Sequence, residues 1–299
     1  MAKLDKVDGA WVNLEKPGGA VFFVGGGTVA NGGIGASDGN SGLDPKQPLA
    51  TIDGTAGAHN KVVAGRGDTI VILPGSVTIT AAIALDVADV TLTGIDPNNT
   101  INPSAILSSL AASADAINVT AANVVIENLH FPASTAATTS RIDAGAAGLV
   151  VRGCTFECGA YDLETITVPA AGLHTTIENN RFYITANGPD AAIEIEAAAA
   201  HFIQIKNNVF FGANSANQWD TGAINSGVAH LDCLVSGNTN TDGEAITFSA
   251  AATGMIVGNV MGYGTLGSML NPGSCMCAEN YEADAIDQSA RLFPNTVAS

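Results

Sequence analysis

The chain has 299 residues, of which 46% are hydrophobic and 13% are charged. This composition is too apolar for a disordered chain, and no apolar run reaches the roughly 18–20 residues that a membrane span needs. The 28 Asp and Glu residues outnumber the 11 Lys and Arg residues, which gives a formal net charge of −17. Because such a field repels a phosphate backbone, we expect neither direct nucleic-acid binding nor a membrane partner.

The first twenty residues are expected to form an N-terminal arm. Residues 1–8 contain no apolar stretch of the kind that a secretory signal peptide has. Trp11 and Val12 lie in a mostly polar segment that ends in Pro17-Gly18-Gly19. We therefore expect residues 1–20 to be a docking arm with Trp11 and Val12 as its contacts, on a protein without a signal peptide.

Residues 21–64 are expected to be an entry loop and a cap. The Gly- and Asp-rich stretch from Gly39 leads to Pro48-Leu49-Ala50-Thr51-Ile52. Residues 48–64 are the expected cap, because an uncovered sheet edge at the end of a solenoid would template aggregation. Gly54 and Gly57 make a long helix unfavourable there.

Residues 65–285 carry an internal repeat. An apolar residue is followed two positions later by a second one, and a small pair, often Ala-Ala, lies at positions four and five. The mean spacing of about 27 residues is too short for a βαβ unit, and no helical period fills the gaps. The copies begin at Ile83, Ile117, Ile142, Ile166, Ile193, Ile224, Ile246 and Met269.

Each copy predicts two short alternating strands, a tight corner and a loop of variable length. This pattern predicts an all-β fold, a single-stranded right-handed parallel β-helix of about eight to nine coils. Residues 286–299, which include Leu292 and Phe293, are expected to be a C-terminal tail or cap.

An asparagine recurs where the second strand of a copy ends. At that position Asn tolerates a left-handed backbone and can hydrogen-bond to its counterpart one coil away. We therefore interpret these residues as a structural ladder rather than as catalytic groups: Asn180, Asn208, Asn238, Asn259 and Asn280.

The five cysteines show no disulfide framework, because their number is odd and their spacing irregular. Cys233, Cys275 and Cys277 fall inside apolar strand patterns, which favours buried, reduced thiols. Cys275 and Cys277 are not expected to form a zinc pair, because alternate strand residues face opposite sides.

The repeat, together with the entry segment from Gly39 to Gly67-Asp68-Thr69-Ile70 and Pro74-Gly75, resembles the pectin-lyase-like superfamily of right-handed parallel β-helix proteins. Within it, the resemblance is greatest to β-helix proteins of phage virions, and it covers residues 21–285. The resemblance implies the fold but no single function, because that superfamily holds lyases, hydrolases, epimerases, adhesins and phage tailspikes.

A column of acidic residues just before the first strand of several copies is the candidate site. Enzymes of this fold use carboxylates to hold Ca²⁺ or to act as acid and base, and stacked coils would bring these acids within about 5–10 Å. The alternative is that Asp is preferred where a strand follows a turn. No basic residue is expected in the same register, so we predict no catalytic, cofactor or metal site. The column comprises Asp162, Asp190, Asp220, Asp242 and Glu244, with Glu164 as an extension.

Three functions remain open. The favoured one is a non-enzymatic structural protein of a tailed-phage virion, a capsid decoration or tail-associated spike or fibre, which packs with copies of itself, as a trimer, and with other virion proteins. It is favoured because stacking explains most repeated residues. A lyase or glycoside hydrolase that binds a glycan at the acidic column is the first alternative. A bacterial surface adhesin is the second.

Overall fold

The protein is described by a computed structural model in which almost every regular element is a strand. No helix among the described residues is long and apolar enough to cross a membrane. For β1, β2 and β30 only the backbone is described. The structure describes residues 4–7, 10–13, 18–25, 35–95, 104–108, 114–134, 138–186, 189–211, 219–241, 245–264, 269–284 and 290–293.

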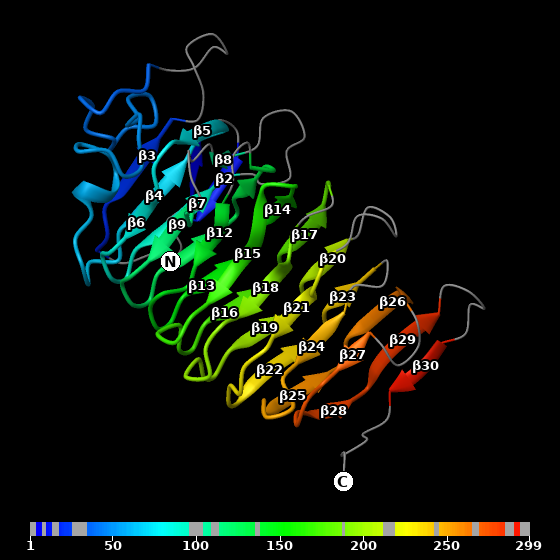
Figure 1. Cartoon of the computed structure of the whole chain (residues 1–299). Coiled ribbons are helices and arrows are strands. Elements are labelled where there is room, and N and C mark those ends of the chain that lie inside the picture. Colours follow the sequence, from blue (N-terminus) through cyan, green and yellow to red (C-terminus); the bar gives the residue numbers. More distant parts are fainter. Residues whose placement is uncertain are drawn as a thin grey trace.

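The strands form three long sheets, which we call sheets 1, 2 and 3. In each sheet the strands follow one another along the same axis, from the N-terminal to the C-terminal end (Figure 1). Sheet 1 contains β3 (Val21–Val24), β4 (Thr69–Ile72), β7 (Thr91–Gly94), β10 (Val125–Glu127), β13 (Val150–Arg152), β16 (Thr176–Glu178), β19 (Gln204–Lys206), β22 (Cys233–Ser236), β25 (Gly254–Val257) and β28 (Met276–Ala278). Sheet 2 contains β5 (Gly75–Ile79), β8 (Ser104–Ser108), β11 (His130–Phe131), β14 (Thr155–Cys158), β17 (Arg181–Ile184), β20 (Val209–Phe211), β23 (Thr239–Asn240), β26 (Val260–Gly264), β29 (Asn280–Asp284) and β30 (Ala290–Phe293). Sheet 3 contains β6 (Ile83–Leu85), β9 (Ile117–Val119), β12 (Thr138–Asp143), β15 (Asp162–Val168), β18 (Ala191–Ile195), β21 (Gly222–Ser226), β24 (Ile246–Phe248) and β27 (Leu270–Asn271).

From β4 onward the chain visits sheets 1, 2 and 3 in turn and then returns to sheet 1, one strand further along. Successive strands of each sheet are parallel from β3 to β29. This topology confirms the predicted right-handed parallel β-helix. Ile83, Ile117 and Ile142 are in register, as are the later predicted starts up to Ile246. The last start is wrong by one residue, since Leu270 and not Met269 aligns with Ile246.

Each coil has three strands, one more than the repeat predicted. The extra strand is the segment after the polar pair, which forms sheet 2. Four of its phenylalanines are buried and stack in register. The ring centroids of Phe131 and Phe156 are 4.7 Å apart, and those of Phe156, Phe182 and Phe210 follow at 4.9 Å. The spacing is that of the strands, so one phenylalanine in each of these four coils fills the core.

The corner between sheets 1 and 2 holds the asparagine ladder. Asn180 N–H donates to Asn208 Oδ1 at 3.0 Å, and Asn208 N–H donates to Asn238 Oδ1 at 2.9 Å. Asn259 and Asn280 continue the chain of bonds, and all five ladder residues are buried. The predicted left-handed conformation is wrong for these residues, because it belongs to the preceding one in each coil: Asn179, Asn207, Gly237, Gly258 and Glu279.

The N-terminal end of the rod is covered by residues 35–66. Leu49, Ile52 and Ala58 are buried in the main core, next to the one-turn 3-10 helix His59–Lys61. Asp53 Oδ2 accepts a hydrogen bond from the N–H of Ala84 on β6, the edge strand of sheet 3. Strand stacking already begins at β3, inside the segment expected as entry loop and cap.

The two chain ends lie outside the regular stack. β30 pairs with β29 and is antiparallel, so it covers the C-terminal edge of sheet 2 with residues expected as a tail. β1 (Leu4–Val7) and β2 (Ala10–Asn13) form a hairpin whose described pairing is only with itself. Trp11 and Val12 belong to β2, and their side chains lie outside the described part of the structure.

Candidate functional site

The predicted acidic column is not a single row. Asp162 begins β15 and is in register with Thr138, whereas Asp190 donates its backbone N–H to Leu163 O, one position later. The two acids are therefore offset by one register position. Asp162 is buried and Asp220 is exposed. Asp242 and Glu244 lie outside the described residues, and within the described ones no three His, Cys, Asp or Glu are grouped to hold a metal ion.

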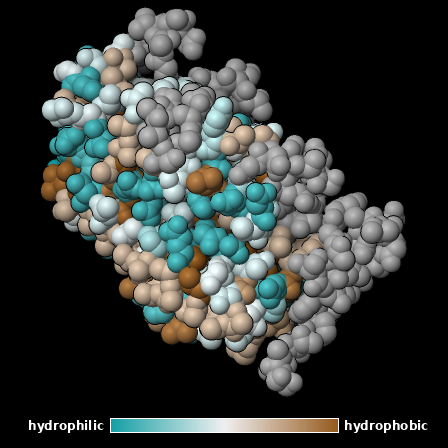
Figure 2. Space-filling model, in the orientation of Figure 1, coloured by the Kyte–Doolittle hydropathy of each residue, from teal (hydrophilic) through white to brown (hydrophobic). Residues whose placement is uncertain are grey.

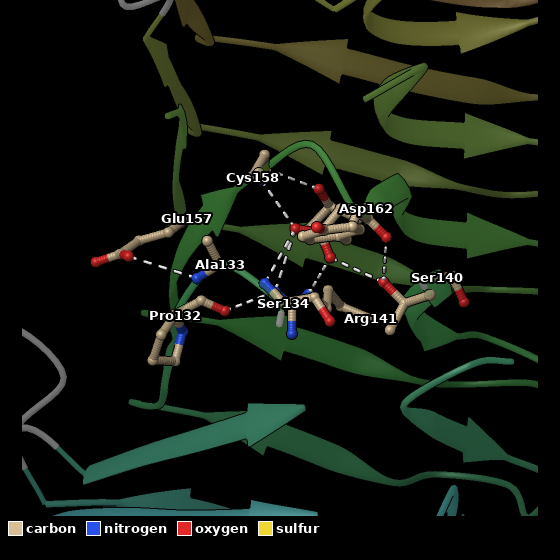
Figure 3. Close-up of polar contacts among 12 residues, drawn as sticks. Pro132, Ala133, Ser134, Ser140, Arg141, Glu157, Cys158 and Asp162 are labelled. Carbon is tan, nitrogen blue, oxygen red and sulfur yellow. Dashed lines mark hydrogen bonds and ion pairs between the residues drawn. The ribbon is translucent and has the colours of Figure 1, made fainter. Parts of the chain in front are cut away.

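Asp162 forms a buried ion pair with Arg141, which comes from β12 one coil earlier (Figure 3). Arg141 Nε lies 2.7 Å from Asp162 Oδ1, and Arg141 Nη2 donates to Pro132 O at 2.6 Å. Thr138 Oγ1 and Gly159 N–H also donate to the Asp162 carboxylate, at 2.8 and 2.9 Å. Arg141 does not share the register of Asp162, which is in register with Thr138, but its side chain reaches the carboxylate from three residues further along β12.

This ion pair is a structural clamp. Both side chains are at most 1% exposed, so no substrate reaches them. A buried pair needs further hydrogen bonds to the two ions, and here Pro132, Thr138 and Gly159 supply them, while Arg141 Nη1 has no hydrogen-bond partner among the described residues. The signal in the sequence is an arginine directly before Ile142, where the next coils carry Thr165, Ala192 and Ala223.

A different set of carboxylates gathers near the outer surface of sheet 3, where Figure 2 shows a hydrophilic band across the middle of the molecule. Asp143 and Glu194 lie in one row across β12, β15 and β18, separated by Thr167. We call this set the carboxylate face: Asp115, Asp143, Glu164, Asp190, Glu194 and Glu196. Asp190 and Glu164 belong to the predicted column, whereas Asp143, Glu194 and Glu196 follow the first apolar residue of a copy and were not predicted.

Burial and mutual repulsion disfavour charge on the carboxylate face. Burial first, then Asp115 and Glu196, raise the pKa of Asp143 to about 6. Burial first, then Asp190, raise the pKa of Glu164 to about 7. The pKa of Glu194 is raised as well, chiefly by burial. Part of this face is therefore protonated near neutral pH.

A second polar cluster lies on the outer face of sheet 2. His130 Nε2 lies 2.9 Å from Glu157 Oε1, and Tyr183 donates its hydroxyl proton to the same oxygen at 2.8 Å. The hydrogen bond with His130 contributes most to lowering the pKa of Glu157, to about 2, while burial first and then Glu157 raise the pKa of Tyr183 to about 12. Both values move away from the neutral range that proton transfer needs. This cluster joins three coils.

Exposed apolar side chains gather at the C-terminal half of sheets 1 and 2. Leu234, Met255 and Met276 are adjacent in one outward row of sheet 1, and Val260 pairs with Tyr281 on sheet 2. Six of the ten exposed large apolar residues in the described chain lie here, each 45–61% exposed. We call this surface the apolar strip: Phe202, Leu231, Leu234, Met255, Val260, Met276 and Tyr281.

The earlier coils of sheet 1 have a different outer surface. There a second outward row of sheet 1, two residues further along each strand than the row of Leu234, alternates in charge. It runs through Glu127, Arg152, Glu178 and Lys206. Arg152 Nη2 lies 2.7 Å from Glu127 Oε2, and Lys206 Nζ lies 3.3 Å from Glu178 Oε2. The outer face of sheet 1 thus changes from paired charges to uncharged, apolar residues along the rod.

All five cysteines are buried and free, as predicted for Cys233, Cys275 and Cys277. Burial raises the pKa of Cys154 and Cys158 to about 12, so neither thiol ionises near neutral pH. Because the thiolate is the reactive form, these residues act as small apolar core residues.

Comparisons with known proteins assign no function to the chain. No family model matches the chain, and no curated protein matches it. Two solved structures are similar. One is described as "Geobacillus virus E2 - ORF18", with 12% identity over 93% of this chain and a TM-score of 0.41; the present chain spans 66% of its length. The other is a rhamnogalacturonan lyase, with 10% identity over 88% of this chain and 87% of its own and a TM-score of 0.40. Neither assigns an activity to this chain, which its own sheet topology identifies as a parallel β-helix.

Proposed function

We propose that the protein is a non-enzymatic structural component of a tailed-phage virion, a capsid decoration or a tail-associated spike or fibre, that packs with copies of itself. The apolar strip carries this proposal. Contiguous exposed apolar surface gives a monomer in water no advantage, and it is the usual mark of a contact with another protein.

The interior of the rod supports the same function. Stacked aliphatic residues, the phenylalanine column and the asparagine ladder use the repeated residues for rigidity along the axis. Five buried, reduced thiols fit assembly in a reducing compartment such as the host cytoplasm, with the virion as the final location.

The N-terminal hairpin is the proposed docking arm. A two-stranded hairpin alone is marginally stable in water, so β1 and β2 gain stability by docking on another protein. Trp11 and Val12 lie on β2 and are the proposed contacts with that virion protein.

The test is a comparison of phage particles with and without the protein. Particles purified from a lysate of the phage that carries the gene should contain the chain in many copies by mass spectrometry. A chain lacking residues 1–20 should fold but remain free in the lysate instead of binding to the particles. Complete particles that lack the chain, with all of it free in the lysate, would contradict the proposal.

A second candidate function, cleavage of a polysaccharide, is favoured by one observation. Glu164 has a pKa raised to about 7 by burial and nearby carboxylates, and a protonated carboxyl beside ionised ones is the arrangement of an acid and base pair in glycoside hydrolysis. Acidic and neutral polysaccharides should then be shortened by the native chain and about 1,000-fold more slowly by Glu164→Gln. Asp220→Asn, at an exposed acid outside the carboxylate face, is the matched control. No cleavage by the native chain removes this candidate.

A further inference from the structure

We propose that the outer surface of sheets 1 and 2 from β16 to β29, which contains the apolar strip, binds the same surface of a second copy in an antiparallel pair related by a two-fold axis, with the carboxylate face of each copy turned to solvent. The inference rests on the proposed self-packing and names the face and the symmetry. It differs from the trimer that the sequence favours.

The distribution of charge selects the face. Six carboxylates lie on the carboxylate face, so two copies that met there would bring like charges together. On sheet 1, by contrast, the charges before the strip are already paired, and the strip itself carries none. Despite the net charge of −17, two copies can therefore approach along sheets 1 and 2 at low electrostatic cost.

Charge complementarity selects the antiparallel arrangement. The outward row of sheet 2 runs through Arg181, Val209, Thr239, Val260 and Tyr281, one residue per coil. A two-fold axis at Thr239 places Arg181 of one copy opposite Tyr281 of the other. Glu279, an exposed acid, lies at the corner just before Tyr281. The positive charge of Arg181, which lies 5.6 Å from the ring centroid of Phe211 in its own copy, thus also meets an acid and an aromatic ring of the partner.

Sheet 1 has the same midpoint. Its outward row runs through Thr176, Gln204, Leu234, Met255 and Met276, and Leu234 is the central residue. Leu234 on β22 and Thr239 on β23 belong to the same coil. One axis through this coil therefore centres both rows of the interface.

Phe202 supplies an independent observation. It has φ 58 and is 46% exposed, stacked on His174 with ring centroids 4.8 Å apart. The same corner is left-handed in earlier coils at Asn123 and Gly148, which are residues that tolerate this backbone. A bulky aromatic residue held in a strained conformation at the surface is expected where a contact offsets its cost.

The size of the surface predicts a weak pair. The five strands from β16 to β28 span about 20 Å at the spacing of parallel strands, and sheets 1 and 2 together are about 25 Å wide. Two copies would bury about 1,000 Å² in total, which is the lower limit of specific interfaces. We expect a dissociation constant of about 1–100 μM.

Sedimentation velocity from about 1 to 100 μM tests the surface. The native chain should pass from monomer to dimer, and Met255→Glu with Met276→Glu should raise the dissociation constant at least about 100-fold. Leu43→Glu changes an equally exposed apolar residue at the other end of the rod and should leave the dimer intact. Circular dichroism should show that both variants keep their strands.

Two further measurements test the symmetry. Thr239→Cys should be joined to Thr239→Cys of a second copy by a short bismaleimide, whereas Thr155→Cys, on the same row beyond the strip, should not. The native thiols are buried and do not compete. Arg181→Glu and Glu279→Arg should each weaken the dimer, and the double variant should restore it.

The outcomes separate this inference from the proposed function. A native chain that is monomeric at 100 μM, a trimer, or a dimer indifferent to Met255→Glu with Met276→Glu overturns the inference. The analysis of purified particles still decides whether the chain is a virion component. Conversely, the chain could be absent from virions and still form the antiparallel dimer. That result would refute the proposed virion location and support the proposed dimer surface.

Discussion

At the scale of single residues, the ladder asparagines do more than fill a corner. Asn208 donates through Nδ2 to Ile177 O at 2.9 Å and accepts from the N–H of Asn180 at 3.0 Å. Replacing it by an apolar residue leaves buried backbone groups without partners, and each such group costs about 1–3 kcal/mol. We expect Asn208→Leu to lower the free energy of unfolding by about 2–4 kcal/mol in urea titrations.

The residue just before Asn208 is the matched control. Asn207 is exposed and has φ 53, a conformation that glycine adopts without strain. Asn207→Gly should change stability by less than about 0.5 kcal/mol. Equal losses in the two variants would show that the ladder hydrogen bonds contribute nothing specific.

Arg141 gives a second prediction at this scale. Arg141→Met leaves Asp162 as a buried charge without its cation, which costs about 3–5 kcal/mol. Adding Asp162→Asn should recover part of that loss, since no buried charge then remains. Urea midpoints of the single and double variants measure this coupling, and purely additive losses would contradict it.

At the scale of elements, sheet 3 makes stability depend on pH. Asp143 and Glu164 have folded-state pKa values of about 6 and about 7, above those of the unfolded chain. A raised carboxyl pKa means that the folded state binds more protons, so stability rises as pH falls from about 8 through 7 and 6. We expect the Tm to be a few degrees higher at pH 6 than at pH 8. Glu164→Gln should remove much of this difference.

His230 limits the gain at lower pH. It is fully buried against Phe248, neither ring nitrogen has a hydrogen-bond partner within the described part of the chain, and burial lowers its pKa. The unfolded chain then binds the proton more readily, so stability falls as pH drops through about 6.5 and below. A Tm that instead rose steadily from pH 6 to pH 8 in the native chain would contradict the assigned carboxylate effect.

At the scale of the whole molecule, the closed core makes all five thiols report on unfolding. Their pKa values are raised by burial, so none should react with a thiol reagent at pH 8 in the folded protein. All five should react together once denaturant unfolds the rod. Reaction of one or two thiols at low denaturant would instead show that part of the rod opens separately.

The amino-acid sequence by itself determined the fold and most of the register. Inward and outward positions follow from local alternation, so the sequence alone predicts the register from Ile83 to Ile246 and the ladder from Asn180 to Asn280. Only the tertiary structure decided the third strand of each coil, the pairing of Arg141 with Asp162, the carboxylate face and the apolar strip. These features depend on which residues meet across coils. The number of residues between two such positions differs from coil to coil, because the loops between sheets 2 and 3 differ in length. Periodicity therefore predicts what stacks inside the rod, while the register of the folded chain decides what its outer faces can bind.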